Sequence, residues 1–216
     1  HRVAKDHQCG CLLLGLGSEA AADSSESKLN ALIDKIDADV AVMRSPPGWV
    51  LSNAQRILVA VGGRGEQHEL RARVLTSICR SRDRDITFVT VVRPETSDAE
   101  AERIRKNIVR LGELKVRGDS KVKILRGADP VATLVAEAAN YDLLLVGLRS
   151  SAAQALRGVA LAVAQNAPCA TLLLRRSKMG MFDMLVPSRE GVMDSFKDVV
   201  GTSTKSIATI DRGDGD

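Results

Sequence analysis

Two glycine-rich segments are the parts of this sequence whose residue types and spacing could bind a ligand. Residues 62–65 (Gly-Gly-Arg-Gly) follow the apolar run 57–61, and residues 147–151 (Gly-Leu-Arg-Ser-Ser) follow the run 143–146. Glycine lets a backbone approach closely, so both segments could present N–H groups to a phosphate. The candidate binding residues are Gly62, Gly63, Arg64, Gly65, Gly147, Arg149, Ser150 and Ser151. The alternative is that the glycines simply end buried strands, because neither segment matches a P-loop or a G-x-G-x-x-G turn.

The sequence shows no catalytic or metal-binding spacing. Of its three histidines, only His68 falls in a segment expected to fold, and its position favours a solvent-facing side chain over an acid–base role. No serine has a G-x-S-x-G context. Cys9 and Cys11 are too close together for a zinc site, and no Cys/His pair follows them. We therefore expect neither an enzyme nor a metal-binding protein.

The composition indicates an aliphatic core and argues against nucleic-acid partners. Hydrophobic residues make up 44% of the chain, but there are only one Trp, one Tyr and three Phe. Such a core favours strands that helices cover on both faces, and it leaves few aromatic rings on which bases could stack. The 31 Lys and Arg against 27 Asp and Glu give a net charge of +4, and the charges are mostly interspersed. We interpret them as a solvated surface.

Five short aliphatic runs alternate with four helical patterns between residues 54 and 176. The runs are 57–61, 86–92, 122–125, 143–146 and 170–174, and the helical patterns lie between them. Ser97 with Glu100 forms a capping box, and Asp129 precedes a proline at the first position of the next helix. This alternation, with right-handed crossovers, predicts an α/β fold with a doubly wound, five-stranded parallel sheet.

Residues 1–45 look like the rear part of a second copy of this unit. The segment 13–18 resembles 146–150, and 38–44 parallels 167–173. The expected division is the C-terminal part of a first unit at 1–45, a linker at 46–53, a complete domain at 54–176 and a C-terminal tail at 177–216. We expect Trp49 of the linker to pack in the crevice between the two units.

The order of these motifs resembles the universal stress protein family. The opening strand at 57–61, the strand that ends at Gly147 and the helix that leads into residues 166–169 carry the resemblance, which covers 54–176. It implies a sheet of strand order 3-2-1-4-5. Family members that bind ATP usually carry an acidic residue after the first strand and a late G-x-x-G-x9-G-Ser/Thr loop.

This sequence departs from that nucleotide pattern in both loops. Gly62 stands where the acidic residue is expected, Ser150 replaces the second glycine of the late loop, and the stretch that follows Gly147 is shorter than the pattern requires. In the earlier copy, residues 23–28 carry acidic side chains that would repel phosphate. We therefore expect no cofactor, with ATP or AMP as the ligand to test.

Similar tandem units occur as cytosolic C-terminal regions of amino-acid and cation–chloride transporters. The leading hypothesis is a non-catalytic regulatory and dimerisation module of such a transporter, acting through edge strands and the crevice near Trp49. Its partners would be a second copy of the chain, the missing half of the first unit and a transmembrane transport domain. It would lie in the cytoplasm, at the cytoplasmic face of the membrane. Because the chain does not begin with Met, we expect a piece of a longer protein. The alternative is a soluble ATP- or AMP-binding stress protein.

Overall fold

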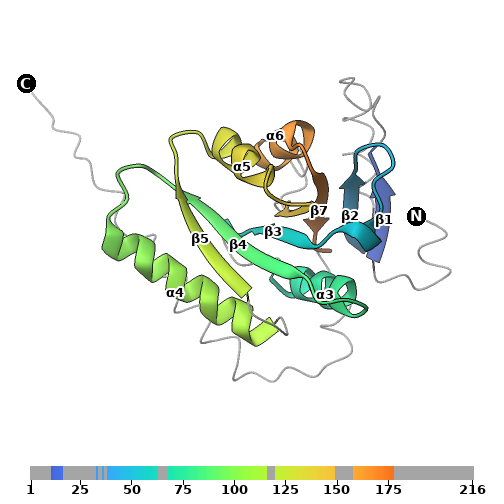
Figure 1. The fold of residues 1–216 in the computed structure, drawn as a ribbon, viewed down its shortest axis with the longest axis horizontal. Helices are drawn as coiled ribbons and strands as arrows, with labels where there is room; N and C mark the ends of the chain where they lie inside the picture. The colour runs from blue at the N-terminus through green and yellow to red at the C-terminus, as the bar shows by residue number, and fades with distance from the viewer. Residues whose placement is uncertain are drawn as a thin grey trace, which may run out of the picture. The chain divides into compact units, whose positions relative to one another are not determined.

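The computed structural model describes residues 11–16, 33, 36, 38–62, 68–115, 120–148 and 158–177. They form one seven-stranded sheet with helices on both faces (Figure 1). The strands are β1 (Cys11–Gly15), β2 (Asp39–Arg44), β3 (Arg56–Ala60), β4 (Asp85–Val92), β5 (Ser120–Arg126), β6 (Leu143–Gly147) and β7 (Ala170–Arg175). The helices are η1 (Leu51–Asn53), α3 (His68–Cys79), α4 (Asp98–Lys115), α5 (Pro130–Ala138) and α6 (Val159–Asn166).

The strands lie in the order β1-β2-β7-β6-β3-β4-β5. All neighbouring pairs are parallel except β2 and β7, which run antiparallel. The expected α/β fold is therefore confirmed, and the observed sheet is mostly parallel, with seven strands where the sequence predicted five. The five strands contributed by 54–176 follow one another as β5-β4-β3-β6-β7, so the first of them lies in the middle.

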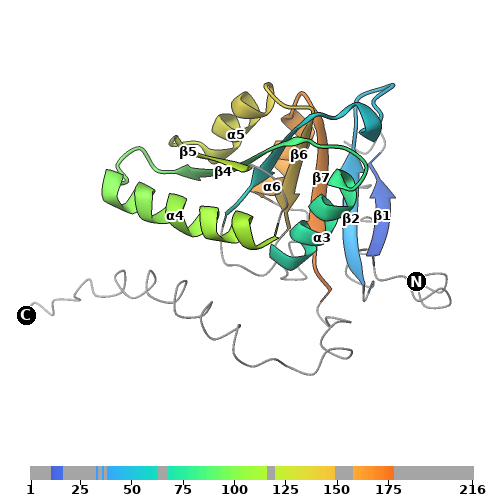
Figure 2. The same ribbon diagram turned by 60° about the horizontal axis from the view of Figure 1, so that its bottom comes forward.

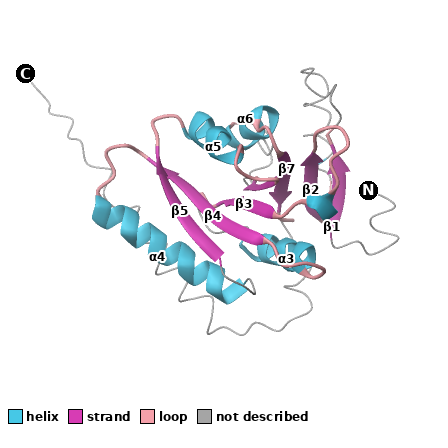
Figure 3. Ribbon diagram, in the orientation of Figure 1, coloured by secondary structure: helices cyan, strands magenta, loops and turns pink. Residues whose placement is uncertain are grey.

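Two aliphatic cores lie on opposite faces of the sheet. Helices α5 and α6 cover one face and α3 and α4 cover the other (Figures 2 and 3). Alternate residues of each central strand enter different cores: in β6, Leu144 faces the α5/α6 side, whereas Leu143 and Leu145 face the α3/α4 side. Strands buried on both faces explain why the sequence reads as continuous apolar runs.

The expected helix starts are present at α4 and α5. Before α5, a carboxylate oxygen of Asp129 accepts hydrogen bonds from the backbone N–H groups of Val131 at 2.8 Å and Ala132 at 3.2 Å. Before α4, the hydroxyl of Ser97 accepts from the backbone N–H of Glu100 at 3.2 Å. These side chains satisfy helix N–H groups that have no partner within the helix.

The structure describes the linker fully, the last helix in part and the tail only at its first residue. The linker 46–53 contains the short helix η1. The last of the four helical patterns, before the run 170–174, is described as a helix only from Val159, after Gly158, whose φ of 88° suits glycine. The tail is described only at Ser177, so residues 178–216 lie outside the described part of the chain.

Candidate functional site

Gly62 and Gly147 lie at neighbouring strand ends on the carboxyl edge of the sheet. Strands β3 and β6 pair in parallel, with Val59 opposite Leu145, so Gly62, two residues after β3, and Gly147, the last residue of β6, lie at the same edge. The backbone N–H of Val61 donates to the carbonyl of Val89 at 2.7 Å and fixes the chain just before Gly62. A side chain at Gly62 would meet no atom within 4 Å, so open space adjoins this glycine.

The other candidate binding residues are not placed. Gly63, Arg64, Gly65, Arg149, Ser150 and Ser151 lie outside the described residues. The structure therefore places two of the eight predicted residues at one edge of the sheet, and ligand binding by all eight stays a prediction. Among the described residues there is no group of three His, Cys, Asp or Glu side chains that could hold a metal ion. The described residues also contain no helix that is long and apolar enough to cross a membrane.

A buried arginine near this edge was not anticipated from the sequence. Arg71 lies in the first turn of α3 and is only 7% exposed. Its Nε and Nη1 atoms are buried without a hydrogen-bond partner. Burial lowers the pKa of its guanidinium to about 10, so the group stays charged at neutral pH. Its place on the buried stripe of the helix, four residues before Leu75, was the only sequence signal.

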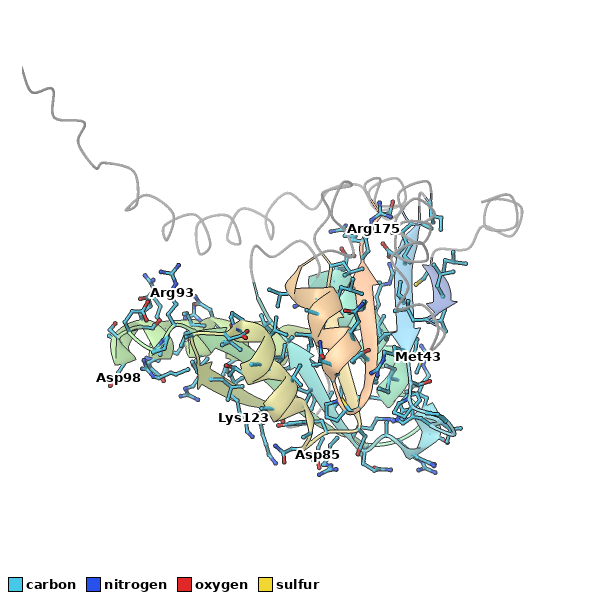
Figure 4. All side chains as sticks on the ribbon, turned by 90° about the horizontal axis from the view of Figure 1, so that it is seen from above. Met43, Asp85, Arg93, Asp98, Lys123 and Arg175 are labelled. Atoms are coloured by element: carbon cyan, nitrogen blue, oxygen red, sulfur yellow. The ribbon has the colours of Figure 1, made fainter. Side chains whose placement is uncertain are left out.

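The antiparallel junction of β2 and β7 joins two similar parallel pairs of strands. In one pair Gly15 of β1 lies opposite Met43 of β2, and in the other Gly147 of β6 lies opposite Leu174 of β7. The residue after each glycine donates its N–H to the carbonyl of that partner, at 2.7 Å in both pairs. Figure 4 shows Met43 and Arg175 at opposite ends of the junction, as antiparallel pairing requires.

These registers correct one alignment made from the sequence. They make Arg44 equivalent to Arg175, whereas the sequence comparison of 38–44 with 167–173 placed Arg44 against Leu173. The sequence comparison matched alanines near the strand starts. In the folded chain, hydrogen bonds to the neighbouring strands β1 and β6 decide which residues are equivalent.

Residues at matching register positions of β1 and β6 differ sharply in burial. Leu13 is 63% exposed, whereas its equivalent Leu145 is 0% exposed beneath the α3/α4 side of the sheet. Cys11 is exposed, whereas its equivalent Leu143 is 1% exposed. On its other edge β6 pairs with β3, but β1 is the last strand of the described sheet. The outer edge and one face of β1 are thus open in the described structure.

Helix α3 connects the 54–176 domain to the start of β2. The guanidinium of Arg73 pairs with the carboxylate of Asp39 at 2.9 Å, and the other oxygen of Asp39 accepts from the backbone N–H of Ser177 at 2.9 Å. Glu69 pairs with Arg176 at 3.1 Å. These polar contacts fix α3 against the strand ends of the junction.

A small pocket opens at the amino edge of the sheet, opposite Gly62 and Gly147. It has a volume of about 280 Å³ and is lined by Pro46 and Trp49 of the linker, by Tyr141 and Asp142 before β6, and by Pro168 before β7, among others. Trp49 also packs against the core on the α3/α4 side. The described lining residues all come from the linker and the 54–176 domain.

Comparison with known proteins identifies a family and a fold. The model of the universal stress protein family matches residues 53–175. No curated protein matches the chain in sequence. A solved universal stress protein from Archaeoglobus fulgidus DSM 4304 is similar, with a TM-score of 0.54 and 17% identity over 82% of this chain and 65% of that chain. The chain therefore spans less than two thirds of that protein.

Two other solved structures are similar in different ways. The cytoplasmic domain of a prokaryotic cation chloride cotransporter has a TM-score of 0.54 and 13% identity, over 76% of this chain and 62% of that chain. An Arabidopsis thaliana universal stress protein with AMP bound has 20% identity over 57% of this chain and 93% of that chain. Its TM-score is 0.44, so no conclusion about this chain rests on it.

Proposed function

Because this chain belongs to the universal stress protein family, we propose that it is a non-catalytic cytosolic regulatory and dimerisation module. In this proposal the module is the C-terminal region of a membrane transporter of the amino-acid or cation–chloride type. Residues 1–45 are the end of a first unit, and 54–176 form the complete second unit. The likeness to a cotransporter cytoplasmic domain supports the fold that such a module would have.

The observation that carries the proposal is the continuous sheet across the β2–β7 junction. One polypeptide places two parallel strand pairs side by side in antiparallel orientation, with matching registers. Such an arrangement buries an interface between two units and sets how they are oriented. A module of this kind acts by changing how it packs on its partners.

The contrast between Leu13 and Leu145 supports a missing front half of the first unit. In the complete unit, α3 and β3 cover the residues of β6. An edge strand with a leucine that is 63% exposed lowers solubility and can pair with a strand of another chain. We therefore expect a strand and a helix of the first unit to cover β1.

The test is fractionation of the full-length protein that contains this chain. We expect it in the membrane fraction, released by detergent but not by high salt or carbonate. Recovery of the full-length protein in the soluble fraction would contradict attachment to a transporter. If it is in the membrane, transport should change when the 1–216 segment is deleted, whereas unchanged transport would contradict the regulatory role.

The alternative, a soluble ATP- or AMP-binding stress protein, is favoured by one observation. Gly62 and Gly147 lie at adjacent strand ends with open space beside Gly62, where α/β folds bind ligands. Thermal unfolding in millimolar ATP or AMP tests it, because a ligand that binds only the folded state raises the Tm. An unchanged Tm removes this alternative.

A further inference from the structure

Arg71 carries a buried positive charge that nothing in the described structure neutralises. It is 7% exposed, and two of its three nitrogens are buried without a hydrogen-bond partner. A buried charge without a partner is strongly unfavourable, and most buried polar groups in folded proteins are satisfied by protein, water or an ion. The unpaired guanidinium of Arg71 therefore points to a bound anion that would accept its hydrogen bonds.

The acidic side chains described on α3 and at the start of β2 already have partners. Glu69 of α3 pairs with Arg176 at 3.1 Å, and Asp39 of β2 pairs with Arg73 at 2.9 Å. The carboxylates described at this end of α3 are therefore committed to other arginines. The anion has to come from outside the described residues.

From the geometry of helices we infer that the Arg71 guanidinium lies near the start of α3. Arg71 precedes Leu75 by four residues and Ile78 by seven, so all three lie on the buried stripe of the helix. Long side chains in helices point back toward the N-terminus. Because α3 follows β3, its N-terminus lies at the carboxyl edge of the sheet, where Gly62 adjoins open space.

We propose that Arg71 and the first turn of α3 bind a phosphate group, either free or carried by a larger ligand. The first N–H groups of a helix lack acceptors within the helix and form its positive end, which favours anions. A guanidinium matches phosphate geometry with two parallel hydrogen bonds. Through this site the module would respond to a bound anion. The proposal requires neither the transporter nor the tandem arrangement proposed above.

The experiment measures the Tm of the purified chain in inorganic phosphate and in chloride at equal ionic strength and pH. The variants are Arg71→Met, Arg71→Lys and, as a matched control on the exposed surface of α4, Arg110→Met. We expect a saturable rise of Tm with phosphate in the wild type and in Arg110→Met. Arg71→Met should abolish the rise, and Arg71→Lys should weaken the apparent Kd about tenfold or more.

A second readout separates binding from a purely structural role. Without phosphate, Arg71→Met should be at least as stable as the wild type, because it removes a buried charge that lacks a partner. A destabilised Arg71→Met chain, or a wild type whose Tm responds to phosphate no more than to chloride, would overturn the proposal.

Further ligands identify the source of the phosphate. AMP and adenosine are compared in the same assay. A rise with AMP that needs Arg71 assigns the phosphate to a nucleotide, and a rise with phosphate alone assigns it to the free ion. If adenosine raises the Tm as much as AMP does, phosphate recognition by Arg71 is wrong.

Discussion

Arg44 and Arg175 reach across the β2–β7 junction in opposite directions. Arg44 ends β2 and donates from Nη1 to the carbonyl of Ala167, just before β7, at 3.0 Å. Arg175 ends β7 and donates from Nη1 to the carbonyl of Ile33, in the segment before β2. Each arginine thus satisfies a carbonyl of the opposite half, and together they fix the two halves at both ends of the junction.

Loss of Arg175 should destabilise the chain more than loss of Arg44. Arg175 is 1% exposed, so Arg175→Ala leaves a cavity and removes a buried hydrogen bond to the Ile33 carbonyl, which keeps only the backbone N–H of Ile36, at a cost of about 3 kcal/mol. Arg44 is only half-buried, and Arg44→Ala should cost about 1 kcal/mol. Urea unfolding measures both free energies. If both variants lost the same free energy of unfolding, the difference in burial between Arg175 and Arg44 would not determine stability.

The strands and helices of 54–176 could be predicted because local rules and the final fold agree there. Aliphatic runs became buried strands, and Asp129 and Ser97 cap the helices that their positions indicated. The edge of the sheet where Gly62 and Gly147 lie followed from chain order alone, since parallel strands end at the same edge.

The junction and the buried charge could not be predicted in the same way. Antiparallel pairing of β2 with β7 joins residues more than a hundred positions apart, and no local pattern specifies its register. Arg71 was counted among surface charges, because a sequence does not reveal that a charged residue lies at the centre of a buried stripe. The pocket near Trp49 likewise depends on how the linker folds back onto Tyr141.

Asp142 should make stability depend on acid pH. Its carboxylate accepts hydrogen bonds from the backbone N–H groups of Gln55 at 2.9 Å and Arg56 at 2.8 Å. Burial raises the pKa of this carboxyl, but these hydrogen bonds and the nearby Arg56 guanidinium together outweigh burial and hold the pKa below its usual value of 3.8. The stabilisation is therefore complete above pH 3.8 and is lost as the pH falls through the lower folded value.

Asp142→Asn tests this dependence. At neutral pH it should cost about 1 kcal/mol, because an amide oxygen is a weaker acceptor than a carboxylate. Its free energy of unfolding should also fall less than that of the wild type between pH 5 and pH 3. Parallel pH profiles for the two proteins would show that Asp142 is not the titrating group.

The thiols of Cys11 and Cys169 should react at very different rates. Cys169 is 8% exposed, and burial raises its pKa to about 11, so almost none of it is thiolate at pH 8. Cys11 is exposed, and its pKa is also raised, first by partial burial and then by Asp39. Cys169 should be alkylated at least about tenfold more slowly than Cys11. Peptide mass spectrometry of the Cys9→Ser variant measures both rates, and equal rates would contradict the burial of Cys169.

Gly127 should not tolerate a side chain, because Thr133 occupies the space beside it. A methyl group at Gly127 would lie 2.0 Å from Oγ1 of Thr133, which is held by donating to the carbonyl of Asp129 at 2.6 Å. We expect Gly127→Ala to cost about 1–3 kcal/mol by overpacking. Gly62→Ala, which faces open space, should change the free energy of unfolding little.

A double-mutant cycle identifies Thr133 as the cause. In Thr133→Ala the hydroxyl is absent, so Gly127→Ala should cost clearly less there than in the wild type, with a coupling of about 1 kcal/mol. The remaining cost reflects the Cβ of Thr133, which lies 3.0 Å from the added methyl position. Additive costs would mean that the strain arises from the backbone of Gly127, because a backbone effect does not depend on the side chain at position 133.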